Sequence, residues 1–166
     1  MTHPNIYGAC ALAEQYQKPY LDASVFIAWI RGEVTAEGVD RGKTANHILT
    51  LAERGEFSVY TSTLTLAEVH KKRRGPMLAG GQDERILAYF EHDYVKLIDV
   101  DRRIGEEANG LCRKYGILPN DAVHLACALR AGCDVLLAWD PELTAVKHPG
   151  IRIEEPRIIG QLEREP

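Results

Sequence analysis

The chain alternates short apolar runs, rich in β-forming residues, with longer segments whose apolar residues recur every three or four positions. Five short runs are predicted to be strands: residues 19–22, 57–61, 95–100, 135–138 and 151–153. The longer segments are predicted to be helices: residues 24–31, 41–54, 64–74, 82–91, 102–115, 120–130 and 141–146. Strands separated by helices pair in parallel through right-handed crossovers. The sequence therefore predicts a three-layer α/β/α sandwich with a central, mainly parallel five-stranded sheet.

Length and composition fit a single soluble domain. A chain of 166 residues, 45% apolar and 27% charged, is long enough to bury a hydrophobic core. Residues 1–18 are predicted to be an N-terminal extension, residues 19–153 the folded domain and residues 154–166 a polar C-terminal tail. No apolar run approaches the ~20 residues of a membrane span, and the N-terminus lacks the pattern of a secretion signal. We therefore expect a cytoplasmic protein without membrane contact.

Cysteine usage and net charge limit the function further. The four cysteines form neither a C-x-x-C pair nor a disulfide framework, which fits a reducing cytoplasm. The net charge of −4 argues against a long electrostatic contact with nucleic acid. It still allows a nuclease whose acidic residues gather at a metal site and whose substrate contact is local.

Four carboxylates stand where a helix begins after an apolar run: Asp22, Glu68, Asp121 and Asp140. Each has a structural explanation. Asp22 and Asp140 are suited to be N-caps, Thr65-x-x-Glu68 matches a capping box, and Asp121 fits a first helical turn with Asn120 as its cap. Taken one at a time, the structural explanation is favoured for all four.

The expected topology groups three of these carboxylates. Loops that leave parallel strands emerge at one edge of the sheet, where ligands bind. Asp22, Asp140 and the turn before Glu68 follow strands directly, so they belong to that edge. Asp121 begins the helix that leads into the fourth strand, and we expect it at the opposite edge. The pattern alone therefore does not include Asp121 in the site.

If the four carboxylates do converge, their repulsion would raise their pKa values unless they share a cation. A set of carboxylate oxygens suits Mg²⁺ or Mn²⁺, and the sequence has no Cys/His set of the kind that zinc prefers. Phosphodiester hydrolysis is the reaction that such a metal site favours.

Four sequence motifs carry a resemblance to a known family. They are Leu21-Asp22-Ala23-Ser24-Val25, the Thr-Leu-Ala-Glu run ending at Glu68, the run from Asn120 to Ala128, and Asp134-Val135-Leu136-Leu137 leading to Asp140. In these motifs and their order, over roughly residues 19–153, the chain resembles PIN-domain ribonucleases. The resemblance is strongest to the VapC toxins of type II toxin–antitoxin systems.

The resemblance implies a metal-dependent endoribonuclease that hydrolyses RNA. It implies that Asp22, Glu68, Asp121 and Asp140 are the catalytic carboxylates around Mg²⁺ or Mn²⁺. It also gives auxiliary roles to the hydroxyl of Ser24 and to Glu142, a spare acid. The partners that it implies are an RNA substrate, a neutralising antitoxin protein and a second copy of the chain in a homodimer.

Two alternatives remain open. The family usually has Thr or Ser two residues before the last Asp, whereas this chain has Ala138 followed by Trp139. This difference leaves room for a catalytically inactive PIN-like module that binds RNA or protein. A phosphotransfer domain with Asp22 as nucleophile is disfavoured, because Ser24 stands where phosphatases carry the second Asp of their D-x-D pair.

Two further features lie near the proposed acids. The dense basic run Lys71, Lys72, Arg73 and Arg74 is either a solvated helix end or an RNA phosphate contact. His124 is one helical turn from Asp121 and so on the same face of its helix. A histidine satisfied within a half-buried helix is favoured over one that contacts the site.

Overall fold

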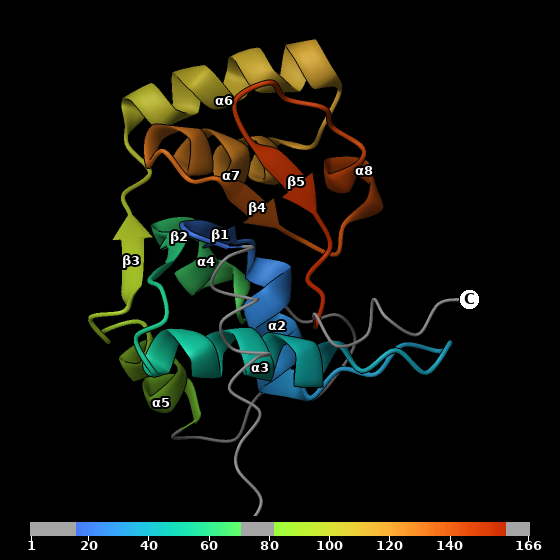
Figure 1. Cartoon of the computed structure of the whole chain (residues 1–166). Helices are drawn as coiled ribbons and strands as arrows, with labels where there is room; N and C mark the ends of the chain where they lie inside the picture. The colour runs from blue at the N-terminus through green and yellow to red at the C-terminus, as the bar shows by residue number, and fades with distance from the viewer. Residues whose placement is uncertain (1–15, 71–81, 159–166) are drawn as a thin grey trace, which may run out of the picture.

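A computed structural model of the chain describes residues 16–70 and 82–158. Its centre is a five-stranded sheet in which every neighbouring pair of strands is parallel (Figure 1). The strands, in the spatial order β3-β2-β1-β4-β5, are β1 (Pro19–Leu21), β2 (Val59–Ser62), β3 (Val95–Ile98), β4 (Val135–Leu137) and β5 (Arg152–Glu154). The predicted five-stranded parallel sheet is confirmed.

Helices cover both faces of this sheet. They are α2 (Ala23–Arg31), α3 (Arg41–Glu53), α4 (Thr63–Glu68), α5 (Gln82–Tyr89), α6 (Arg102–Tyr115), α7 (Pro119–Arg130) and α8 (Pro141–Thr144). The helix predicted over 64–74 ends at Glu68, where Val69 is the C-cap. None of the helices in the described part of the chain has the length and apolarity to cross a membrane.

The core consists of two apolar layers, one on each face of the sheet. On one face, Leu21 and Leu137 pack with side chains of α2 and α3. On the other face, Tyr20 and Leu136 pack with side chains of α6 and α7. Adjacent residues of a strand point to opposite faces, so the central strands β1 and β4 are buried throughout, as a parallel sheet covered on both sides requires. The three-layer arrangement is therefore confirmed.

Strand register sets which residues meet at the C-terminal edge of the sheet. β1 and β4 pair with Leu21 opposite Leu137, and the backbone N–H of Asp22 donates to the carbonyl of Leu137 at 3.0 Å. Asp22 and the residues that follow β4 therefore leave the sheet side by side.

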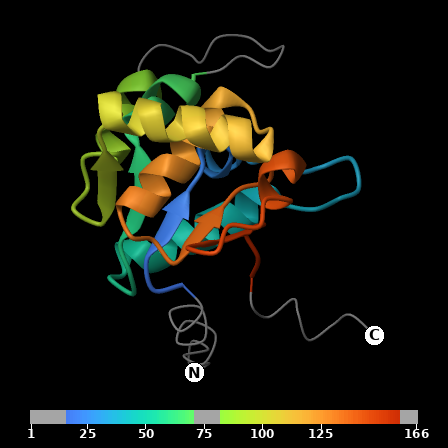
Figure 2. The ribbon, with the colours of Figure 1, turned by 90° about the horizontal axis from the view of Figure 1, so that it is seen from above.

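The position of α7 corrects one expectation. Helices α6 and α7 lie side by side over one face of the sheet (Figure 2). α7 ends at Arg130, and only four residues separate it from Val135, where β4 begins. A 12-residue helix of ~18 Å that delivers the chain to the start of a parallel strand must itself begin near the C-terminal edge. The prediction that Asp121 lies at the opposite edge is therefore wrong.

Candidate functional site at the C-terminal edge of the sheet

A pocket of about 370 Å³ opens where the start of α2, the end of α4 and the start of α7 meet. Three of the four predicted carboxylates line it: Asp22, Glu68 and Asp121. Its other lining residues are Ala23, Ser24, Ile27, Leu118, Pro119 and Asn120. The pocket thus combines acidic side chains with an apolar wall.

Asp22 both caps a helix and borders the pocket. It is the N-cap of α2, and its Oδ2 accepts a hydrogen bond from the backbone N–H of Ser24 at 2.8 Å. Asp22 is only 7% exposed, and its Oδ1 lies 3.4 Å from Nε2 of His124. The structural explanation for Asp22 is correct, and it is compatible with a place at the site.

Glu68 is held by two side chains of α7. Its Oε1 accepts a hydrogen bond from Nδ2 of Asn120 at 2.7 Å, and its Oε2 lies 2.7 Å from Nε2 of His124. The capping-box explanation is wrong, because the N-cap of α4 is Ser62 and Thr65 lies inside the helix. Glu68 instead joins the end of α4 to the first turns of α7.

Asp121 has a carboxylate oxygen without a partner. It lies in the first turn of α7, whose N-cap is Leu118 rather than the expected Asn120. Its Oδ2 is buried and makes no hydrogen bond within the described residues. Burial is the largest cause and the negative charges of Asp22 and Asp140 add to it; together they raise the pKa of Asp121 from 3.8 to about 6. A buried acceptor left in this state costs free energy unless something binds it.

Asp140 and Glu142 do not line the pocket. Asp140 is the N-cap of α8, and its Oδ1 accepts hydrogen bonds from the backbone N–H groups of Glu142 at 2.8 Å and Leu143 at 3.2 Å. Its negative charge is nevertheless one of the causes, after burial and Asp22, that raise the pKa of Asp121. Glu142 is exposed. The structure thus leaves Asp140 at the margin of the site and Glu142 outside it.

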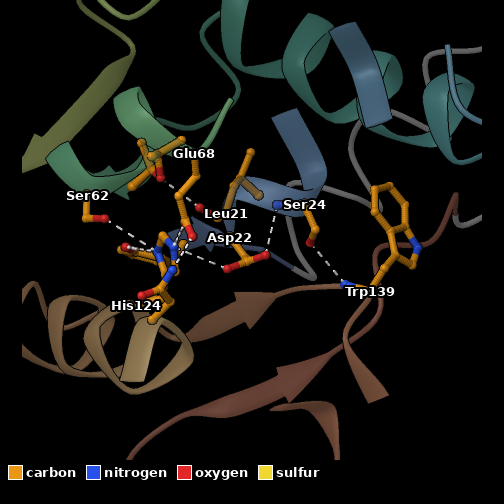
Figure 3. A network of polar contacts seen from close by, with 11 residues as sticks. Leu21, Asp22, Ser24, Ser62, Glu68, His124 and Trp139 are labelled. Atoms are coloured by element: carbon orange, nitrogen blue, oxygen red, sulfur yellow. Dashed lines mark hydrogen bonds and ion pairs between the residues drawn. The ribbon is translucent and has the colours of Figure 1, made fainter. Parts of the chain in front are cut away.

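His124 is the residue that sequence reasoning undervalued. Its side chain is 1% exposed, and its Nε2 contacts both Glu68 and Asp22 (Figure 3). Burial lowers the pKa of His124, but the charges of Asp22 and Glu68 outweigh burial, so the net pKa is raised. The favoured explanation of a satisfied histidine is correct, yet its partners are the acids of the site. The signal that pointed to it was its three-residue spacing from Asp121.

The hydroxyl of Ser24 has a local partner. Ser24 Oγ accepts a hydrogen bond from the backbone N–H of Trp139 at 3.3 Å. The basic run Lys71, Lys72, Arg73 and Arg74 lies outside the described residues.

The donor set is suited to a hard divalent cation. Within residues 16–70 and 82–158, no three His, Cys, Asp or Glu side chains are arranged as a ready set of metal ligands. Carboxylate oxygens are nevertheless the donors that Mg²⁺ and Mn²⁺ prefer, and three carboxylates border this one pocket. The unpartnered Oδ2 of Asp121 is an acceptor that a cation would satisfy.

Solved structures with the same fold include several toxins. A toxin–antitoxin complex from Klebsiella pneumoniae is 20% identical, with a TM-score of 0.59 over 84% of this chain and 98% of that one. Mycobacterium tuberculosis VapC20, described as a sarcin-ricin loop cleaving toxin, is also 20% identical, with a TM-score of 0.59 over 81% and 98%. VapBC2 from Rickettsia felis, bound to a DNA fragment from its promoter, is 16% identical, with a TM-score of 0.55 over 83% and 98%. At these identities the likeness shows the fold.

Sequence comparison gives the family directly. No curated protein sequence is significantly similar to the chain. The profile of the PIN domain, however, matches residues 20–149, which include all four predicted carboxylates. The chain therefore belongs to the PIN domain family.

Proposed function

We propose that this protein is a Mg²⁺- or Mn²⁺-dependent endoribonuclease and a VapC-like toxin. The observation that carries the proposal is the pocket in which Asp22, Glu68 and Asp121 meet, with an unpartnered carboxylate oxygen on Asp121. Membership of the PIN family supports a nuclease. The similarity to VapC20, a sarcin-ricin loop cleaving toxin, supports RNA as the substrate.

The residues that would hold the metal are Asp22, Glu68 and Asp121, with Asp140 as a fourth carboxylate at the margin. A bound divalent ion would activate water and neutralise charge on the phosphate. Contacts within the chain would orient the carboxylates around that ion. Asp22 is fixed by its capping bond, and Glu68 is fixed by two donors from α7. Side chains that are already oriented lose little entropy when substrate and ion bind.

The partners follow from the same proposal. The Klebsiella pneumoniae neighbour is a toxin–antitoxin complex, which supports an antitoxin as the protein that neutralises this chain. We propose that the protein acts in the cytoplasm as a homodimer, with Lys71, Lys72, Arg73 and Arg74 contacting RNA phosphates. Neutralising these four cations should flatten the salt dependence of RNA binding, whereas an unchanged slope would contradict the phosphate contact.

A cleavage assay with matched aspartate variants tests the function. Purified protein is incubated with single-stranded and structured RNAs in Mg²⁺, in Mn²⁺ or in EDTA. We expect cleavage by the wild type with either metal. EDTA, Asp22→Asn and Asp121→Asn should each abolish it.

Asp101→Asn is the control. Asp101 is also an N-cap, at the start of α6 and outside the pocket, and Asn caps a helix as well as Asp does. This variant should cleave like the wild type. Cleavage that survives both EDTA and Asp22→Asn would contradict the metal mechanism. Metal binding without cleavage would favour the inactive PIN-like module instead.

A further inference from the structure

The ring of His124 lies where three elements of the site meet. His124 itself is on α7, Glu68 ends α4, and Asp22 follows β1. Nε2 of His124 is 2.7 Å from Oε2 of Glu68 and 3.4 Å from Oδ1 of Asp22 (Figure 3). The histidine thus contacts both of these pocket carboxylates through one ring nitrogen.

The chemistry of the partners fixes which ring atom carries hydrogen. Ionised carboxylates only accept hydrogen bonds, so Nε2 must be the protonated nitrogen. This holds for the neutral Nε2–H form of His124 and for its charged form alike. The N–H that donates to Glu68 is therefore present whatever the charge of the ring, and Asp22 lies 3.4 Å from the same nitrogen.

The opposite side of the ring is also restrained. Nδ1 lies 2.9 Å from the hydroxyl of Tyr20 and 3.4 Å from the hydroxyl of Ser62. Tyr20 is fully buried in the central strand β1, and Ser62 is the fully buried last residue of β2. Both anchors belong to the sheet, so the rotation of the imidazole is set by the rigid centre of the fold.

We propose that His124 is a positioning residue that holds Glu68 and Asp22 at a fixed separation, and that Tyr20 fixes the orientation of its ring. The inference rests on the proposed nuclease function, because the two carboxylates are the ones proposed to hold the metal. Residues that orient metal ligands typically contribute 10–100-fold in metal affinity or activity.

Three variants separate positioning from general support of the fold. His124→Leu removes the donor but fills the space, His124→Gln restores an N–H donor near the position of Nε2, and Tyr20→Phe removes only the hydroxyl. Each is measured for Mn²⁺ affinity by calorimetry, for kcat and KM of RNA cleavage, and for its thermal unfolding temperature.

We expect His124→Leu to weaken Mn²⁺ binding and to lower kcat by about 10–100-fold with little change in KM. His124→Gln should recover most of this loss, and Tyr20→Phe should lie between Gln and the wild type. A merely structural histidine would lower the unfolding temperature while the folded variants kept the wild-type Mn²⁺ affinity and kcat. That result in folded His124→Leu, or wild-type Mn²⁺ affinity and kcat in Tyr20→Phe if His124→Leu does not fold, would overturn the inference.

A readout without metal or RNA keeps the two proposals apart. In ¹⁵N-histidine-labelled protein free of metal, NMR should show a hydrogen-bonded Nε2–H on His124 that changes in Glu68→Gln. A ring protonated only at Nδ1 would overturn the positioning inference. Wild-type protein that shows the expected Nε2–H, but neither binds Mn²⁺ nor cleaves RNA, would overturn the proposed function while leaving the placement of His124 intact.

Discussion

The hydroxyl oxygen of Ser24 accepts a hydrogen bond from the backbone N–H of Trp139, with 3.3 Å between the two heavy atoms. This contact joins the first turn of α2 to the segment that follows β4. Asp140 is the next residue along that segment. The serine therefore restrains the backbone beside the fourth carboxylate of the site.

Replacing Ser24 with Ala should destabilise this junction modestly. The lost hydrogen bond is expected to lower the free energy of unfolding by about 0.5–1.5 kcal/mol. For a chain of this size, that corresponds to a fall in Tm of roughly 2–4 °C per kcal/mol. Calorimetry measures the change. Ser58→Ala is the control. Ser58 is also half-buried, but it lies before β2 and away from the contact between Ser24 and Trp139, so this substitution should leave Tm unchanged. Equal stability of the two variants would show that the Ser24 contact contributes nothing.

Two substitutions at Asp140 distinguish its role as the N-cap of α8 from the role of its negative charge. Asp140→Asn keeps an N-cap acceptor for Glu142 and Leu143, so we expect a Tm close to that of the wild type. Asp140→Ala removes the cap and should cost about 0.5–2 kcal/mol. If the charge serves the metal site, both variants should lose RNA cleavage to a similar extent. Full activity in Asp140→Asn would limit Asp140 to a structural role.

The raised pKa of Asp121 predicts how the stability of the metal-free protein depends on pH. Its ordinary value of 3.8 is raised to about 6 in the folded state, so the native protein binds a proton more tightly than the unfolded chain. This contribution to stability is complete below the unfolded pKa and is lost as the pH rises through the folded pKa.

Asp121→Asn mimics the protonated form permanently. In EDTA near neutral pH, this variant should therefore unfold at a higher temperature than the wild type. The difference should vanish at about pH 4, where the wild-type carboxyl is also protonated in the folded state. Scanning calorimetry over this pH range measures it. A variant that is less stable than the wild type at neutral pH would show that the Asp121 charge is satisfied without metal.

Gly42 and Gly105 predict opposite effects of the same substitution. A Cβ on Gly42 would lie 2.7 Å from the backbone Cα of Gly32. Only a shift of the backbone at one of these two glycines could relieve this clash. Gly42→Ala should destabilise by about 1–3 kcal/mol. A Cβ on Gly105, inside α6, meets nothing within 4 Å. Gly105→Ala should stabilise by roughly 0.5–1 kcal/mol, because Ala favours a helix more than Gly does. Urea unfolding of both variants tests this pair, and a tolerated Gly42→Ala would contradict the close approach.

The fold could be predicted from local sequence patterns. The site could not be predicted in full, because it depends on contacts between residues that are far apart in the sequence. Strand-to-helix junctions were sufficient to place Asp22 at the C-terminal edge. They failed for Asp121, because two helices stand between β3 and β4, and the pattern does not reveal which of them runs back across the sheet. The contacts of Glu68 with Asn120 and His124 join residues 52 and 56 positions apart. Only the packing of α7 against β2 and α4 brings them together.

α7 carries Asn120, Asp121 and His124 within a little more than one turn of a continuous helix. Each residue of an α-helix turns the following side chains by about 100°. One residue inserted between Asp121 and His124 would therefore turn the imidazole away from Glu68 and Asp22. Both residues lie within the helix, so no loop between them could compensate for the rotation. Related chains should vary freely in length across residues 33–40, yet keep the count from residue 120 to residue 124 unchanged.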